Sequence, residues 1–304
     1  MNGSGELFFF GSLVLLALAA LLWSLWLLQR KQPPTPTFCS VEIPSGFNLH
    51  YQDIGSGPPI LFLHGIGASL FCWRLLLPFL SSKYRLILLD LPGFGKSDKP
   101  TGADYGLEAQ CQRLREFLDQ LDLQRVFLVG SSMGGTLALW LSLREPERCK
   151  KLVTISPATD PSLVPRGIHR LARLSSPLSR TTRRWVIHQA LRRVVLHHQK
   201  LSPEDVDQYW APYKRNPAAV RTFLLATQAI SDSRLPHELS LLSVPTLILW
   251  GEKDKMVPQK SMDQLKATLP KATLLCHSKA GHHVQEDQPE WTAYHIDQFF
   301  QSSV

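Results

Sequence analysis

The stretch VGSSMGG at residues 129–135 places Ser132 in a G-x-S-x-G turn at the end of an apolar run. A serine hydroxyl becomes a strong nucleophile only when a base removes its proton, so it must stand exposed at a sharp strand-to-helix turn. Gly130 and Gly134 permit such a turn because they lack the Cβ atoms that would crowd neighbouring backbone. The pattern therefore predicts a buried strand, a nucleophilic Ser132 and a following helix. Ser131 is excluded as the centre of the motif because position 129 is valine.

A base and an orienting carboxylate for this serine are found downstream, each on a loop that follows an apolar run. Asp254 follows the run at residues 244–251, and His282 follows the run at residues 273–276. Because both loops are expected at the same edge of a sheet as the serine, we predict a triad in which His282 is the base and Asp254 orients it. Asp160 follows another apolar run and remains an alternative acid.

Backbone donors for an oxyanion are predicted in the turn HGIG at residues 64–67, which follows the apolar run ILFL at residues 60–63. The small residues of this turn let backbone N–H groups face a site. We assign the oxyanion hole to the N–H groups of Ile66 and Met133, because the second donor at such turns belongs to the residue after the nucleophile. The side chain of His64 is expected to brace the loop rather than to transfer protons.

Short, nearly continuous apolar runs predict strands that are buried on both faces of a parallel sheet. Helix-length segments separate the runs, and apolar residues recur at three- and four-residue spacing across residues 107–121. This alternation of strands and helices indicates an α/β fold. The runs lie at residues 60–63, 86–89, 126–129, 152–155, 246–249 and 273–275.

Together these motifs make the chain resemble the α/β-hydrolase fold family over roughly residues 40–300. The resemblance rests on HGIG at 64–67, DLPGFGKS at 90–97, the Ser132 turn, the Asp254 loop and Gly281-His282. It implies a mostly parallel central sheet with helices on both faces, a Ser–His–Asp triad and no cofactor or metal. The glycine–histidine pair favours His282 over the adjacent His283 as the base. A serine at the turn argues against the related dehalogenases and epoxide hydrolases, which place an aspartate there.

Two glycine-containing stretches do not fit nucleotide binding. The tail GKS at residues 95–97 would need a glycine at position 90, which is aspartate, to match a P-loop. The turn at residues 64–67 lacks the third glycine of a dinucleotide fingerprint, because position 70 is leucine. Nucleic acid is not an expected partner either, since no known nucleic-acid-binding module accompanies the basic residues.

The N-terminal segment is a candidate transmembrane anchor. Leu7 to Leu28 contains no charged residue, and its 22 residues, at about 1.5 Å each, would cross a hydrocarbon core of about 30 Å. A cleaved signal peptide is the alternative, because residues 17–19 have the form of a cleavage site, but no basic residue precedes the segment. Arg30 and Lys31 follow the segment, so the positive-inside rule places the catalytic domain in the cytoplasm.

We expect an anchor at residues 1–31, a proline-rich linker at 32–40 and a hydrolase domain at 41–304 with a helical lid at about 157–243. This lid is an insertion after the run at residues 152–155, which corresponds to the sixth strand of the resembling family, and it is far longer than a crossover requires. Residues 161–203 hold nine Arg or Lys and no Asp or Glu, which accounts for the formal net charge of +8. Residues 185–196 mix apolar and cationic positions at helical intervals, which predicts an interfacial helix and a membrane surface as partner. A basic face without a partner is the alternative.

The five cysteines are odd in number, widely spaced and form no C-x-x-C pair. This pattern indicates buried thiols in a reducing compartment rather than a disulfide framework. The cysteines are Cys39, Cys72, Cys111, Cys149 and Cys276.

These features predict a serine hydrolase that cleaves a carboxylic ester through an acyl-enzyme. The anchor and the basic lid make the chain similar to membrane-bound monoacylglycerol lipases and lysophospholipases, which implies a lipid ester as substrate. Three alternatives stay open: hydrolysis of a carbon–carbon bond in a small diketone, acyl transfer, and a non-catalytic lipid-binding scaffold. Acyl transfer is included because residues 282–287 also match the H-x-x-x-x-D pattern of acyltransferases.

Overall fold

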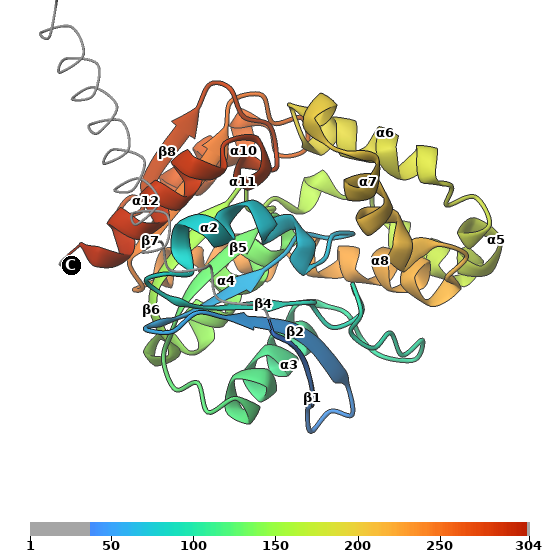
Figure 1. Cartoon of the computed structure of the whole chain (residues 1–304), viewed down its shortest axis with the longest axis horizontal. Coiled ribbons are helices and arrows are strands. Elements are labelled where there is room, and N and C mark those ends of the chain that lie inside the picture. Colours follow the sequence, from blue (N-terminus) through green and yellow to red (C-terminus); the bar gives the residue numbers. More distant parts are fainter. Residues whose placement is uncertain (1–36, 303–304) are drawn as a thin grey trace, which may run out of the picture. The chain divides into compact units, whose positions relative to one another are not determined.

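The computed structural model describes residues 37–302, which are built around an eight-stranded sheet in the order β1-β2-β4-β3-β5-β6-β7-β8 (Figure 1). The β1–β2 and β2–β4 pairs are antiparallel, and the other pairs are parallel. The strands are β1 (Thr37–Glu42), β2 (Asn48–Ile54), β3 (Pro59–Leu63), β4 (Arg85–Leu89), β5 (Val126–Ser131), β6 (Cys149–Ile155), β7 (Thr246–Gly251) and β8 (Thr273–His277).

Strands β3 to β8 coincide with the six predicted apolar runs and confirm the α/β fold. Strands β1 and β2 were not predicted, because TFCSVE and NLHYQDI mix polar and apolar residues and contain no continuous apolar run. Strand β8 lies at the edge of the sheet, and all of its residues are partly or fully exposed. The prediction that every run is buried on both faces is therefore wrong for residues 273–275, since an edge strand has a neighbour on one side only.

Apolar side chains of the parallel strands alternate between two hydrophobic clusters, one on each face of the sheet. Leu61 and Leu63 pack in the cluster that includes residues of α3 and α4, whereas Ile60 and Phe62 pack in the cluster with η1 and α12. Helices therefore cover both faces, as predicted (Figure 1). Outside the lid the helices are η1 (Leu70–Leu76), α2 (Leu77–Leu80), α3 (Leu107–Gln120), α4 (Met133–Arg144), η2 (Pro146–Arg148), α10 (Gln259–Thr268), α11 (Val284–Asp287) and α12 (Pro289–Gln301).

The lid follows β6 and is helical, as predicted, and its helices α5 to α8 lie together at the right of Figure 1. It contains a small apolar cluster of its own, centred on Tyr213 and Leu224. Helix α6, which coincides with most of the predicted interfacial helix, buries only Leu191 fully. The lid elements are η3 (Pro161–Leu163), η4 (Ile168–Leu174), α5 (Ser175–Ser179), α6 (Arg184–Val194), η5 (His198–Lys200), α7 (Pro203–Trp210), η6 (Ala211–Tyr213), α8 (Pro217–Ile230), α9 (Arg234–Glu238) and η7 (Leu239–Leu241).

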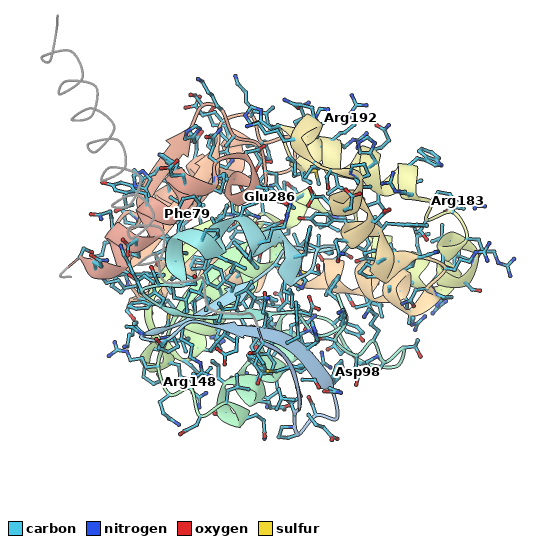
Figure 2. All side chains as sticks on the ribbon, in the orientation of Figure 1. Phe79, Asp98, Arg148, Arg183, Arg192 and Glu286 are labelled. Atoms are coloured by element: carbon cyan, nitrogen blue, oxygen red, sulfur yellow. The ribbon has the colours of Figure 1, made fainter. Side chains whose placement is uncertain are left out.

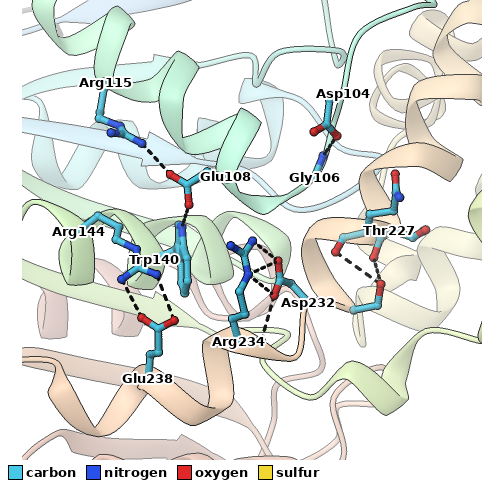
Figure 3. Close-up of polar contacts among 12 residues, drawn as sticks. Asp104, Gly106, Glu108, Arg115, Trp140, Arg144, Thr227, Asp232, Arg234 and Glu238 are labelled. Atoms are coloured by element: carbon cyan, nitrogen blue, oxygen red, sulfur yellow. Dashed lines mark hydrogen bonds and ion pairs between the residues drawn. The ribbon is translucent and has the colours of Figure 1, made fainter.

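Polar contacts around Trp140 join helices α3, α4 and α9 (Figure 3). Trp140 Nε1 on α4 donates to Glu108 Oε2 on α3 at 3.0 Å, and Glu108 also pairs with Arg115 at 2.9 Å. Arg144 on α4 pairs with Glu238 on α9 at 2.7 Å, and its guanidinium lies 3.9 Å from the centre of the Trp140 ring. These contacts hold the helix that follows the serine turn against its neighbours.

No helix within residues 37–302 is long and apolar enough to cross a membrane. The predicted anchor at residues 7–28 lies outside the described residues, as does the first part of the predicted linker at residues 32–40. The last four residues of that linker, 37–40, are strand rather than spacer, because they pair with β2.

The five cysteines are free thiols, and Cys72, Cys111 and Cys149 are buried as predicted. Cys276 is exposed and Cys39 is partly exposed, because both stand on edge strands of the sheet. The prediction of uniformly buried thiols is therefore wrong at these two positions.

The crossing from β5 to α4 leaves no space for a side chain at two glycines. A Cβ atom on Gly134 would collide with the carbonyl oxygen of Leu63, and one on Gly130 would collide with the carbonyl of Gly134. Both obstacles are backbone groups, which cannot rotate away as a flexible side chain can. The start of α4 is therefore in direct backbone contact with the ends of β3 and β5.

We expect Gly134→Ala to lower the free energy of unfolding by about 3 kcal/mol, because the new methyl group must push two main-chain segments apart. Gly102→Ala is the matched control, since a Cβ atom there has no neighbour within 4 Å, and it should change stability by less than about 1 kcal/mol. Urea unfolding of both variants measures the difference. Equal stability of the two variants would contradict the close backbone contact between the start of α4 and the end of β3.

Candidate active site

Ser132 joins β5 to α4, and its backbone is strained. Its φ of 52° and ψ of −120° cost roughly 1–3 kcal/mol in a residue that carries a side chain. Neighbouring segments hold this conformation: the Ser132 N–H donates to the Ile155 carbonyl at 2.9 Å, and its own carbonyl accepts from the Thr136 N–H at 3.0 Å. Gly65 comes so close that a Cβ atom built on it would lie 3.1 Å from Ser132 Cβ. The serine therefore lies at the predicted strand-to-helix turn, beside the HGIG turn.

His282 and Asp254 meet through a hydrogen bond of 2.8 Å between His282 Nδ1 and Asp254 Oδ2. Their loops follow β8 and β7, and because these strands are parallel neighbours, both loops emerge at one edge of the sheet. The other oxygen of Asp254 accepts from the N–H groups of Met256 at 2.7 Å and Val257 at 2.9 Å.

Burial acts to raise the pKa of the Asp254 carboxyl, but the charge and hydrogen bond of His282 and the two backbone donors outweigh it, so the pKa is lowered. An ionised Asp254 can only accept a hydrogen bond, so we assign the Nδ1 proton to His282. The Nε2 of His282 is then the nitrogen that can take up a proton.

No hydrogen bond joins Ser132 Oγ to His282 within residues 37–302. Bonds between a nucleophile and its base commonly tighten only when substrate binds. The structure thus pairs the predicted base with the predicted acid, and it places Ser132 at the end of β5, on the same edge of the parallel sheet.

The residues weighed as alternatives make other contacts. Asp160, the alternative acid, accepts from Ser261 Oγ and from the Ser162 N–H, each at 2.9 Å. Ser131 is fully buried, and His283 Nδ1 pairs with Glu286 at 2.7 Å. The contacts around His282 therefore favour Asp254 over Asp160.

The two backbone N–H groups assigned to the oxyanion hole, those of Ile66 and Met133, donate to no other group within the part of the chain that the structure describes. Met133 is the first residue of α4, where an N–H has no partner in its own helix and favours negative charge. His64 is fully buried, with Nδ1 2.8 Å from the Gly65 carbonyl and Nε2 accepting from the Leu91 N–H at 3.0 Å. Burial lowers the pKa of His64, so the ring is neutral and braces the turn.

Asp90, the first residue of the DLPGFGKS stretch, holds three segments together. Its buried carboxylate accepts from the N–H groups of Leu70 and Lys96, both at 2.8 Å, and from His50 Nδ1 at 2.9 Å. Burial acts to raise the pKa of the Asp90 carboxyl, but the hydrogen bonds from His50 and from the backbone outweigh it, so the pKa is lowered. This stretch therefore supports the loops beside the site and contacts no reacting group.

A cavity of about 260 Å³ lies between the oxyanion turn and the lid. Ile66 and Gly67 of the turn form part of its wall, and helices α6, α7 and α8 of the lid form most of the rest. The lining side chains are predominantly apolar, as in sites that hold aliphatic groups. Those from the lid include Ile187, Leu191, Val194, Val220 and Phe223.

The model of one protein family, the alpha/beta hydrolase fold, matches residues 58–289. The chain belongs to this family. The expected fold, drawn from the glycine-rich turns and the apolar runs, is thereby confirmed.

Relatives within the alpha/beta hydrolase fold family differ in the reactions that their names describe. A 2-hydroxy-6-oxononadienedioate/2-hydroxy-6-oxononatrienedioate hydrolase of Comamonas testosteroni is 31% identical over 252 residues, which are 79% of this chain and 87% of that protein. Haloalkane dehalogenase 2 of Mycobacterium tuberculosis is 28% identical over 269 residues, 83% of this chain and 91% of that protein. A solved structure of a membrane phospholipase A, a bacterial virulence factor, has a TM-score of 0.73 and 28% identity, covering 97% of this chain and 98% of that one.

Sequence reasoning missed the contacts of two buried carboxylates, Glu286 and its neighbour Asp287. Glu286 accepts from Arg74, Tyr209 and His283, and Asp287 accepts from the N–H groups of Gly281, Leu196 and His197. These donors come from η1, from the lid and from the loop between β8 and α11, which carries His282 and His283 and is called the histidine loop below. The only signal in the sequence was the H-x-x-x-x-D pattern at residues 282–287, which was used there to keep acyl transfer open.

We expect the free energy of unfolding to fall as the pH drops below about 4. The pKa of Asp90 is lowered in the folded state, so at low pH the unfolded chain binds a proton at Asp90 more readily than the folded chain does. Asp90→Asn should lower the free energy of unfolding at pH 7 by about 2 kcal/mol and make it less dependent on pH between 5 and 3. Urea unfolding at several pH values measures this. Glu147→Gln, at an exposed position, is the control; an unchanged pH dependence in Asp90→Asn would contradict the assignment.

Proposed function

We propose that this protein is a serine hydrolase that cleaves a carboxylic ester through an acyl-enzyme. The observation that carries the proposal is the buried His282–Asp254 hydrogen bond of 2.8 Å, formed at the sheet edge where the strained Ser132 turn stands. A serine, a histidine and an aspartate with these positions have the chemical roles of nucleophile, base and orienting acid.

In the first half of the proposed reaction, His282 Nε2 removes the proton of Ser132 Oγ as this oxygen attacks the ester carbonyl carbon. The electron pair of the carbonyl moves onto its oxygen, which the N–H groups of Ile66 and Met133 stabilise. Asp254 holds the imidazole in place and stabilises its positive charge.

In the second half, the carbon–oxygen bond to the alcohol breaks, and His282 gives its proton to the leaving alcohol oxygen. Water then enters, loses a proton to His282 and attacks the acyl carbon. Collapse of this second intermediate returns the proton to Ser132 Oγ and releases the carboxylic acid. The sequence of steps conserves protons and needs no cofactor.

We infer that the ester is a lipid, such as a monoacylglycerol or a lysophospholipid. The predominantly apolar cavity beside Ile66 supports this, because it suits a fatty acyl chain. The likeness to a membrane phospholipase A and the apolar segment at residues 7–28, interpreted as a single-pass anchor, also support it.

Hydrolysis of a carbon–carbon bond is a second candidate function. It is favoured by two related proteins, one from Comamonas testosteroni and one from Burkholderia cepacia, whose names describe 2-hydroxy-6-oxo hydrolases. Each is 31% identical to this chain. The same Ser132 and His282 would serve in that reaction, so the residues do not separate the two candidates. The substrate does.

We expect the protein to hydrolyse a monoacylglycerol faster than a 2-hydroxy-6-oxo dienoate. Ser132→Ala and His282→Ala should each lower kcat/KM for the ester by about 10⁴-fold or more, and Asp254→Asn by about 10³-fold or more. The controls are Ser131→Ala and Asp160→Asn, adjacent and alternative residues whose replacement should change kcat/KM by less than about threefold. Dienoate cleavage without ester cleavage would establish the second candidate, and ester turnover that survives Ser132→Ala would overturn both.

We further propose that the lid contacts an anionic membrane surface on the cytoplasmic side. Arg183 and Arg192 project from the outer edge of the lid in Figure 2, and Trp185 between them is 66% exposed. Exposed arginines attract anionic lipid headgroups, and tryptophan favours the membrane interface. This surface would hold the cavity close to lipid substrates.

A fragment that begins at residue 37 should sediment with vesicles that contain phosphatidylserine more than with pure phosphatidylcholine vesicles, and 0.5 M salt should weaken this binding. Reversing two lid charges, Arg192→Glu with Arg193→Glu, should reduce it about tenfold. Reversing two exposed charges outside the lid, Lys255→Glu with Lys271→Glu, gives the same net charge and should have the smaller effect. If both double variants lose the same amount of vesicle binding, the attraction depends on net charge alone and not on the lid surface.

A further inference from the structure

Two polar groups on the cavity wall make no hydrogen bond within residues 37–302: the Nε2 of His283 and the hydroxyl of Tyr213. Neither atom is among the fully buried atoms that lack a partner, so both remain accessible. The other polar side chains of the wall are already occupied, since Tyr209 donates to Glu286 and the Thr182 hydroxyl donates to backbone carbonyls. An accessible ring nitrogen in an otherwise apolar cavity is a group available to a ligand.

Glu286 fixes the orientation of the His283 ring. The fully buried carboxylate accepts from His283 Nδ1 and from the Tyr209 hydroxyl, both at 2.7 Å, and from Arg74 Nη1 at 2.5 Å. Burial acts to raise the pKa of the Glu286 carboxyl, but His283 and Arg74 outweigh it, so the pKa is lowered and the carboxylate accepts. Nδ1 of His283 is therefore the donor, and Nε2 is the nitrogen left for the cavity.

The position of His283 is also fixed relative to the proposed base. The two histidines are adjacent in the chain, and their ring centres lie 5.7 Å apart. The His283 N–H donates to the Val194 carbonyl at 2.8 Å, which ties the histidine loop to the end of α6. In the proposed reaction His282 gives its proton to the leaving alcohol oxygen, so a substrate group next to that oxygen comes within reach of His283, and the apolar remainder of the wall is left for the acyl chain.

We propose that His283 forms a subsite for a hydroxyl group on the carbon next to the one that carries the ester oxygen. This inference rests on the proposed function and names the substrate class: esters of polyols that keep a free neighbouring hydroxyl. A hydroxyl both donates and accepts, so it pairs with Nε2 whether the ring is neutral or protonated. A carbonyl or ether oxygen pairs only with the protonated ring, and an alkyl group pairs with neither form.

The test compares two substrates with the same acyl chain, a 1-monoacylglycerol and the propyl ester, on the full chain in detergent micelles. We expect wild-type kcat/KM to favour the monoacylglycerol by about tenfold or more, the effect of one lost hydrogen bond in a dry site. His283→Phe should bring the ratio of the two kcat/KM values close to one, whatever its effect on the absolute turnover of the propyl ester. His283→Gln, whose amide donates and accepts, should retain most of the preference.

Two controls distinguish the loss of hydroxyl recognition from a general disturbance of the proposed active site. The rate of labelling by an alkyl fluorophosphonate, which carries no hydroxyl, measures how far each His283 variant disturbs the proposed nucleophile and base, and the ester ratio is compared with that rate. His295→Phe, the same change on α12 outside the cavity wall, should keep the wild-type ratio. Where His283→Phe does not fold, His283→Leu replaces it in the comparison.

The outcomes distinguish this inference from the proposed function. Equal turnover of both esters by wild type overturns the hydroxyl subsite and leaves ester hydrolysis intact. A preference that survives in His283→Phe but is lost in Tyr213→Phe overturns the assignment to His283. Turnover of neither ester overturns the proposed function, and the subsite with it.

Discussion

The backbone contact between the start of α4 and the end of β3 is the constraint on which the candidate site depends. Gly134 allows it because no side chain separates the helix from the Leu63 carbonyl. The contact brings the HGIG turn beside Ser132 and the Met133 N–H, so that the proposed nucleophile and the proposed oxyanion donors lie near one another. The strained backbone of Ser132 is held by hydrogen bonds to β6 and α4, and stable structure around it sustains the strain.

Buried carboxylates hold, through hydrogen bonds, the loops that follow the strands at this edge of the sheet. Asp90 joins β2, η1 and the loop after β4; Asp254 joins its own loop to His282; Glu286 and Asp287 join the histidine loop to the lid. Each accepts from two or more donors, which offsets the cost of burying its charge. These polar contacts add to the apolar packing of loop residues such as Leu91 and Ala280.

The lid forms most of the cavity on its inner side and presents charged and aromatic side chains on its outer side. Exposed arginines and Trp185 are among these outer side chains. Because Glu286 receives hydrogen bonds from both Tyr209 in the lid and His283, the cavity wall and the histidine loop share one anchor. The cavity wall and the position of the proposed base are thereby physically connected.

The sequence by itself determined the parallel core of the sheet, the serine turn, the pair of His282 with Asp254 and the helical insertion, because each is encoded by a local apolar run or a short motif. It did not predict β1 and β2, whose mixed side chains resemble those of loops; β2 is defined by pairing with β4, and β1 by pairing with β2. Tertiary structure alone decided that Glu286 is buried and that His283 lines a cavity. The reason is that two of the donors to Glu286, Arg74 and Tyr209, are more than 70 residues away from it in the chain, and only folding brings such donors to one carboxylate.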